Sequence, residues 1–244
     1  MKRTLLLLLI LATSIGLAAQ TADEIISKAI AARGGLDKLK AIQTQRLTGT
    51  ITIGNRAPGP FMVEMKRGGK MRQEMTVGGQ NAVRITNGTA GWKIENDGEA
   101  VPLTDAELRN MAGGADIDGP LVDYKAKGNQ VELEGKEKVN GNDAYKLKIT
   151  QKDGQVRYDY LDVNSFLEVK WQGEIEAGDR KFTAESFFSD YRPVNGVMYH
   201  HQIDSDTLGT PYKQKLVFDK IEVNLPLDDS IFQKPPPSAP TPQK

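Results

Sequence analysis

The chain has 244 residues, with 32 lysines and arginines against 32 aspartates and glutamates, and it has no cysteine. This length is enough for one domain, or at most two, to bury a hydrophobic core. The balanced charge argues against a nucleic-acid partner or an anionic membrane surface, because counterion release needs clustered positive charge. The absence of cysteine excludes disulfides, thiolate metal sites, a cysteine nucleophile and a lipid anchor on an N-terminal cysteine.

The N-terminus has the pattern of a secretory signal peptide. A basic start precedes an apolar run from Leu5 to Ala12, and small residues follow. The apolar run is too short to cross a bilayer as a helix. We expect residues 1–18 to be removed by cleavage after Ala18, with cleavage after Ala19 as the alternative. The mature protein is then expected to be exported, soluble and without a membrane anchor.

The mature chain is expected to begin with a helix and to continue as a long series of strands. Thr21 and Glu24 form a capping box ahead of apolar residues at helical spacing, and Gly34-Gly35 ends that helix. A short helical turn is expected over 36–42. From Arg46 onward, apolar residues alternate with period two, as is typical of a half-buried antiparallel sheet.

The middle of the chain interrupts this alternation. Thr104 and Glu107 form a second capping box for a short helix over 104–111, and 120–124 is a further helical candidate. About five strands precede these helices and seven follow. The later strands are expected over 131–139, 144–150, 156–162, 166–173, 181–191, 197–206 and 212–223.

The predicted fold class is mainly β: a half-open antiparallel barrel of about 11–12 strands. A flat sheet of this size would twist and curl, and the N-terminal helix and the short central helices are expected to act as a lid. Residues 19–233 are expected to form this single domain. The proline-rich residues 234–244 are expected to be disordered.

The sequence has no convincing catalytic or metal-binding pattern. His200 and His201 are adjacent in a predicted strand, so they point to opposite faces, and we expect one to lie on the apolar face and one in solvent. Three aspartate pairs are interpreted as turn residues: Asp116 with Asp118, Asp204 with Asp206, and Asp228 with Asp229. No nucleophile elbow, phosphate-binding glycine loop or zinc motif is present. We therefore expect no enzyme activity, metal or cofactor, and a hydrolase with a nonstandard site is the least favoured alternative.

The apolar face of the curled sheet is expected to line a concave cavity. Methionine is flexible enough to repack around hydrocarbon chains. The methionines that could supply such a lining are Met62, Met65, Met71, Met75, Met111 and Met198. The alternative is that they are ordinary core residues and that the protein's own side chains fill the cavity.

Several segments resemble the LolA-like outer-membrane lipoprotein carriers. Residues 63–67 (VEMKR), 71–75 (MRQEM) and 85–92 (ITNGTAGW) are similar to consecutive motifs of that family, and 224–232 (NLPLDDSIF), ahead of a proline pair, is similar to its closing element. With the leading helix, the resemblance covers nearly all of the mature chain. It implies a half-open barrel of about eleven strands with a helical lid.

The resemblance also implies a non-enzymatic function. Such carriers receive acylated lipoproteins from an inner-membrane ABC exporter, shield the acyl chains in the periplasm and deliver them to an outer-membrane acceptor. We expect a monomer that binds lipoproteins or related lipids and no nucleic acid. The alternative is a lipid-sensing or regulatory binding module on the same fold.

Arg67 matches the family's functional arginine. It follows Phe61, Val63 and Met65 at a spacing of two residues, so it is expected to point to the same, apolar face of the strand. A charge on the apolar side needs a partner, and the expected partners are backbone carbonyls of the closed lid or a lipid headgroup. The alternative is a strand-end arginine that reaches solvent, and Gly68 replaces the family's proline here. The ligand-binding residues that we predict are Phe61, Val63, Met65, Arg67, Met71, Met75, Val83, Ile85 and Trp92.

Overall fold

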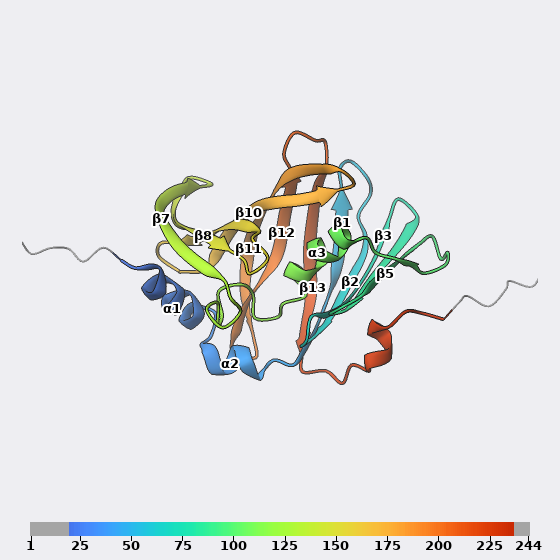
Figure 1. The fold of residues 1–244 in the computed structure, drawn as a ribbon, viewed down its shortest axis with the longest axis horizontal. Helices are drawn as coiled ribbons and strands as arrows, with labels where there is room; N and C mark the ends of the chain where they lie inside the picture. Colours follow the sequence, from blue (N-terminus) through green and yellow to red (C-terminus); the bar gives the residue numbers. More distant parts are fainter. Residues whose placement is uncertain (1–19, 237–244) are drawn as a thin grey trace, which may run out of the picture.

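The computed structural model describes residues 20–236. The expected signal peptide (1–18) lies outside the described residues, as do residues 237–244 of the expected tail. The described part is built on one antiparallel sheet of thirteen strands in the order β6-β5-β4-β3-β2-β1-β13-β12-β11-β10-β9-β8-β7. Since β6 and β7 are separate edges, the sheet curls but does not close, which agrees with the predicted half-open barrel (Figure 1).

The strands are β1 (Thr44–Ile53), β2 (Gly59–Lys66), β3 (Lys70–Val77), β4 (Gln80–Asn87), β5 (Gly91–Glu95), β6 (Val101–Pro102), β7 (Gln130–Val139), β8 (Asn142–Thr150), β9 (Val156–Asp162), β10 (Glu168–Ala177), β11 (Arg180–Val194), β12 (Val197–Thr207) and β13 (Lys213–Val223). The sequence predicts about five strands before the central helix, and the structure adds the two-residue strand β6. The β1 strand begins at the end of the sheet where Arg67 lies, called the Arg67 end here, and it finishes at the opposite, Ile53 end.

Both predicted capping boxes are present. Thr21 caps α1 (Ala22–Ala32) and Thr104 caps α3 (Asp105–Gly114), each with reciprocal hydrogen bonds to a glutamate three residues later. The expected helical turn is α2 (Leu36–Ala41). The prediction of a helix over 120–124 is wrong, since this segment forms consecutive turns. Gly119 and Asp123 adopt positive φ angles of 77° and 52°, which an α-helix cannot contain.

All three α-helices of the described residues pack on the concave face of the sheet. The α1 helix lies against β8 and β9, where Ile25, Ile26 and Ala29 form a buried cluster with Tyr145, Leu147 and Leu161. The α2 and α3 helices contribute Leu39 and Met111 to the main hydrophobic core. Figure 1 shows α3 in front of the middle of the sheet and α2 at the Arg67 end. The helices therefore cover the concave face, as predicted for a lid.

Candidate functional site

Five of the nine predicted ligand-binding residues lie together on the concave face. The β2–β3 register pairs Phe61 with Met75 and Met65 with Met71, so these side chains and that of Val63 share one surface. Four of them are buried in the main core, and Met75 packs against it from a half-buried position. The predicted ligand-binding role of this surface is consistent with its apolar character, which comes from β2 and β3.

Three predicted residues lie on the opposite, convex face. The β3–β4 register pairs Val83 with Glu74, and the β4–β5 register pairs Ile85 with Trp92. The concave neighbour of Met75 on β4 is instead Ala82. The expectation that all nine residues line one surface is therefore wrong for Val83, Ile85 and Trp92. Alternation within one strand does not determine which residues of the next strand lie on the same face, because the turn between the strands sets their register.

The C-terminal segment covers part of the convex face. The short 3₁₀-helix η1 (Asp229–Phe232) packs against β3 and β4, and Phe232 is fully buried there. Asp229 pairs with Lys66 at 2.8 Å and with Lys70 at 2.9 Å, which fixes η1 on this face. Residues on the convex side of β4 therefore belong to a structural contact with the C-terminal segment.

Lid side chains cover the part of the concave face that β2 and β3 form. The lid residues that belong to the main core are Leu39 and Ile42 around α2, Met111 in α3, and Ala115, Ile117 and Val122 in the loop after it. They pack with Met65 and Met71, two of the predicted lining methionines, whereas Met62 and Met198 lie outside this core. The structure thus decides between the two alternatives for the methionines of this core: in this state they pack against the protein's own side chains.

Ion pairs tie α3 to both walls of the half-barrel. On one side Glu107 pairs with Lys93 of β5. On the other side Arg109 pairs with Glu176 of β10 at 2.5 Å, and the Asn110 side chain donates a hydrogen bond to the Glu176 carbonyl at 2.8 Å. These side chains are partly exposed, so each ion pair contributes only about 0–1 kcal/mol. The α3 helix is therefore a lid held at its edges by weak contacts and in its middle by Met111.

Arg67 joins the sheet to the lid at the Arg67 end. Its Nε donates to the carbonyl of Ile42 at 2.6 Å, and its Nη2 donates to the carbonyl of Leu39 at 2.9 Å. The structure thus places Arg67 on the lid carbonyls that we expected it to meet. Its guanidinium also binds Asp118 through two parallel hydrogen bonds, at 2.8 Å and 2.9 Å.

The sequence analysis assigns Asp118 only a turn role, and the structure shows that it belongs to this site. It is only 4 % exposed, and its carboxylate also pairs with Lys40 of α2 at 3.1 Å. The Arg33 guanidinium donates to its backbone carbonyl at 3.0 Å. Burial alone would raise the pKa of Asp118, but hydrogen bonds from Arg67 and Lys40 outweigh it and hold the pKa below its ordinary value. Asp118 is therefore an ionised anchor for the loop that follows α3.

Comparisons with known proteins identify the fold. No known family profile and no curated protein matches the sequence. Solved structures do match. A DUF1329 family protein from Desulfovibrio piger is 14% identical, with a TM-score of 0.59, over 86% of this chain and 96% of that one. A LolA superfamily protein from Nitrosomonas europaea is 18% identical, with a TM-score of 0.57, over 88% of this chain and 99% of that one. The chain has a LolA-like fold.

The LolA-like sheet also buries a charged cluster on its concave side. Arg157 pairs with Asp159 at 2.6 Å and with Glu168 at 3.2 Å, and the Tyr191 hydroxyl donates to the Glu168 carbonyl at 2.6 Å. Burial and the nearby Asp159 raise the pKa of Glu168 to about 8. No local sequence pattern indicates this cluster, because its members come from two strands and their register decides that they meet.

The two histidines have different surroundings from those expected. His201 is buried, and its Nδ1 lies 3.2 Å from the Tyr199 carbonyl. His200 packs against the rings of Phe188 and Tyr191, and burial lowers its pKa to about 4. The expectation that one histidine is solvated is therefore wrong.

Within residues 20–236, no three His, Cys, Asp or Glu side chains converge on a possible metal position, and no helix is long and apolar enough to cross a membrane.

Proposed function

We propose that this protein is a non-enzymatic carrier that binds acyl chains of lipoproteins or related lipids on the concave face of its sheet. The observation that supports this most is the construction of the concave face: an apolar surface from β2 and β3 lies under a lid held by a few side-chain contacts. A long acyl chain costs about 0.8 kcal/mol per exposed CH₂ in water, so crossing an aqueous compartment requires a protein that covers the chain.

The covered concave face means that binding requires the lid to move. A lipid chain would replace the lid side chains, including Met111, so the apolar surface that opening exposes is covered again by the ligand. Methionine side chains on both surfaces can repack around a flexible chain. In the open state Arg67 would separate from the lid carbonyls that it now holds.

The proposed location is the periplasm, and the proposed direction of transport is from the inner to the outer membrane. The expected signal peptide at residues 1–18 supports export, and the LolA-like fold supports lipid carriage. On this proposal the donor is an inner-membrane ABC lipoprotein exporter and the acceptor lies at the outer membrane. The carrier acts as a monomer.

A regulatory module on the same fold is the second candidate. The covered concave face favours it, because a stable closed state suits a protein that responds to lipid rather than one that always carries it. A regulator would bind a partner protein differently in the lipid-free and lipid-bound states, whereas a carrier would transfer its lipid to acceptor vesicles.

The test is direct lipid binding and transfer by the mature protein. We expect native mass spectrometry of the purified protein to detect bound lipid, and a fluorescent fatty acid to bind and then transfer to acceptor membranes. Absence of lipid binding by the correctly folded protein would contradict the carrier proposal. Binding without transfer would favour the regulatory module.

A further inference from the structure

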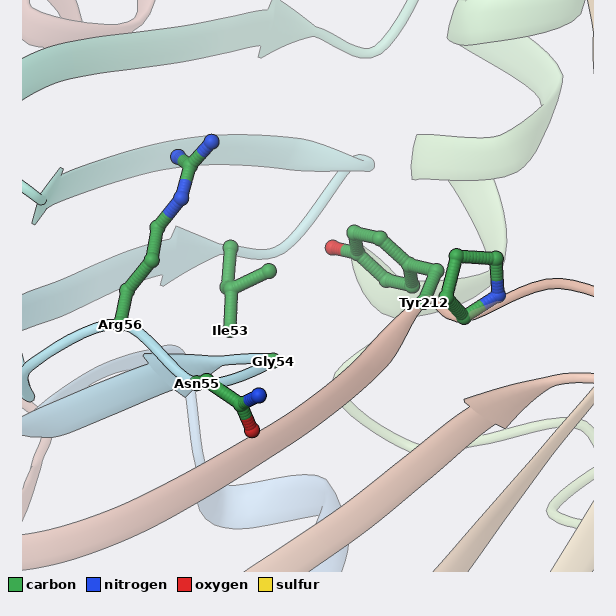
Figure 2. A pocket seen from close by; sticks show the side chains of 6 residues that line it. Ile53, Gly54, Asn55, Arg56 and Tyr212 are labelled. Atoms are coloured by element: carbon green, nitrogen blue, oxygen red, sulfur yellow. The ribbon is translucent and has the colours of Figure 1, made fainter.

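A second apolar region lies at the Ile53 end of the sheet, opposite the Arg67 end. Two neighbouring turns border an open hollow of about 390 Å³, a volume within the size range of small-molecule sites. Residues 53–56 of the β1–β2 turn line one side, and Pro211 and Tyr212 of the β12–β13 turn line the other. Figure 2 shows the Ile53 side chain and the Tyr212 ring facing each other across this space.

The hollow adjoins the concave core. Ile53 is partly buried and packs against the main core cluster, and the register places it on the same face as Ile51. Tyr212 is 44% exposed and the nearby Leu208 is 41% exposed, although most large apolar side chains of the described residues are buried. The apolar surface of the core therefore continues outward through Ile53 to this end of the sheet.

Among the described residues that line the hollow, Arg56 is the one with a charge. Within residues 20–236, no carboxylate lies within ion-pair distance of its guanidinium, whereas the neighbouring Lys213 pairs with Asp206 at 2.5 Å. An uncompensated guanidinium beside apolar side chains is suited to a molecule with an anionic group on a hydrocarbon chain. At the Arg67 end, by contrast, Asp118 already neutralises the arginine.

We propose that this hollow binds the anionic end of a lipid, with its carboxylate or phosphate on Arg56 and its acyl chain passing over Ile53 toward the concave core. The inference rests on the proposed carrier function and deepens it. It assigns the end of the half-barrel through which the chain reaches the concave face, and it adds Arg56 and Tyr212 as binding residues.

A position-specific label tests where the chain lies. The chain has no cysteine, so Asn55→Cys provides a single site for a fluorophore at the hollow. Thr89→Cys, in the exposed turn between β4 and β5 at the Arg67 end, is the matched control. Stearic acid carrying a nitroxide at carbon 5 is expected to quench the label at position 55 and not the label at 89. Quenching at 89 without quenching at 55 would overturn the proposed position.

A charge substitution tests the anionic group. We expect Arg56→Gln to weaken binding of stearate or of lysophosphatidylglycerol by about three- to fivefold, because the guanidinium is exposed. Binding of an uncharged monoacylglycerol should be unchanged. Arg180→Gln, which removes an exposed arginine at the same end of the sheet, is the control and should affect none of the three lipids. A response of stearate alone identifies a free fatty acid as the ligand, and a response of lysophosphatidylglycerol alone identifies a phospholipid.

The two proposals fail in different ways. If the unsubstituted protein binds none of the three lipids, the carrier function itself is contradicted. If it binds them, but Arg56→Gln binds them equally well and the label at position 55 is not quenched, the carrier function stands and the hollow is not the binding site.

Discussion

The guanidinium of Arg67 and the carboxylate of Asp118 form a bidentate ion pair across 51 residues of sequence, with Nη1–Oδ2 at 2.8 Å and Nη2–Oδ1 at 2.9 Å. Arg67 follows β2, and Asp118 belongs to the loop after α3, so the pair connects the sheet to the lid. The same guanidinium holds two carbonyls around α2. One side chain therefore fixes two parts of the lid at once.

Removing this arginine should destabilise the protein. We expect Arg67→Gln to lower the free energy of unfolding by about 2 kcal/mol, because Asp118 would stay buried with Lys40 as its remaining cation. This value is below that for a fully buried pair, since the Arg67 side chain is 27% exposed. Urea denaturation measures the effect. The control Arg72→Gln removes an ion pair between residues of one strand and should cost less than about 0.5 kcal/mol.

A double-mutant cycle isolates the pair itself. Arg67→Gln and Asp118→Asn combined should cost less than the sum of the single substitutions, with a coupling of about 1–2 kcal/mol. A coupling energy indistinguishable from zero would show that the two side chains act independently and that the ion pair does not hold the lid.

The ion pair that holds the lid should weaken in acid. The folded state lowers the pKa of Asp118, so its contribution is fully present above the unfolded value of about 3.9 and disappears as the pH falls through the folded value. Binding of an apolar fluorescent dye should therefore rise below about pH 4. Asp118→Asn should already bind more dye at pH 7 and should show a smaller further increase in acid. An identical acid transition in both proteins would assign it to other carboxylates.

Glu168 should impose the opposite pH dependence. Burial raises its pKa to about 8 in the folded protein, so folding favours its protonated form. The stability it contributes is fully present below its unfolded pKa of about 4.3, declines as the pH rises and is lost above about 8. Glu168→Gln should therefore reduce the loss of unfolding free energy between pH 5 and pH 8. An unchanged pH profile would show that Glu168 ionises normally next to Arg157.

Salt should accelerate lipid binding. The pairs Lys93–Glu107 and Arg109–Glu176 at the edges of α3 are partly exposed, and 1 M salt shortens the screening length to about 3 Å. Weaker edge contacts let the lid open more often, so the association rate of a fluorescent fatty acid in stopped flow should increase with NaCl. The double variant Lys93→Gln/Arg109→Gln should associate faster at low salt and should lose most of this dependence. A rate that falls with salt equally in both proteins would argue against a lid held by these pairs.

Local sequence signals predicted the helices of the lid and the faces of single strands. The capping boxes of Thr21 and Thr104 depend on residues three apart, and both are present. Alternation within β2 correctly grouped Phe61, Val63 and Met65. Such features depend on backbone geometry over a few residues, which a single sequence contains.

Features that depend on strand register could not be predicted from the sequence. Val83 and Ile85 alternate as regularly as the residues of β2, but the turn between β3 and β4 sets Met75 opposite Ala82 and turns them to the convex face. Asp118 sits in a glycine-rich loop where aspartate is common, and only the tertiary structure shows that it is buried against Arg67. The charged cluster around Arg157 likewise forms only when β9 and β10 pair.

The most direct test of the proposed carrier is to map where a bound acyl chain lies. The sheet provides the contrast, because concave and convex residues alternate along each strand and paired residues of neighbouring strands share a face. A fatty acid with a photoreactive diazirine at its chain end, bound to the mature protein and irradiated, is expected to cross-link to Val63, Met65 or Met71 on the concave face. Peptide mass spectrometry locates the adduct. Cross-links confined to convex residues such as Val83 or Trp92, or no specific cross-link at saturating lipid, would contradict an acyl-chain site beneath the lid.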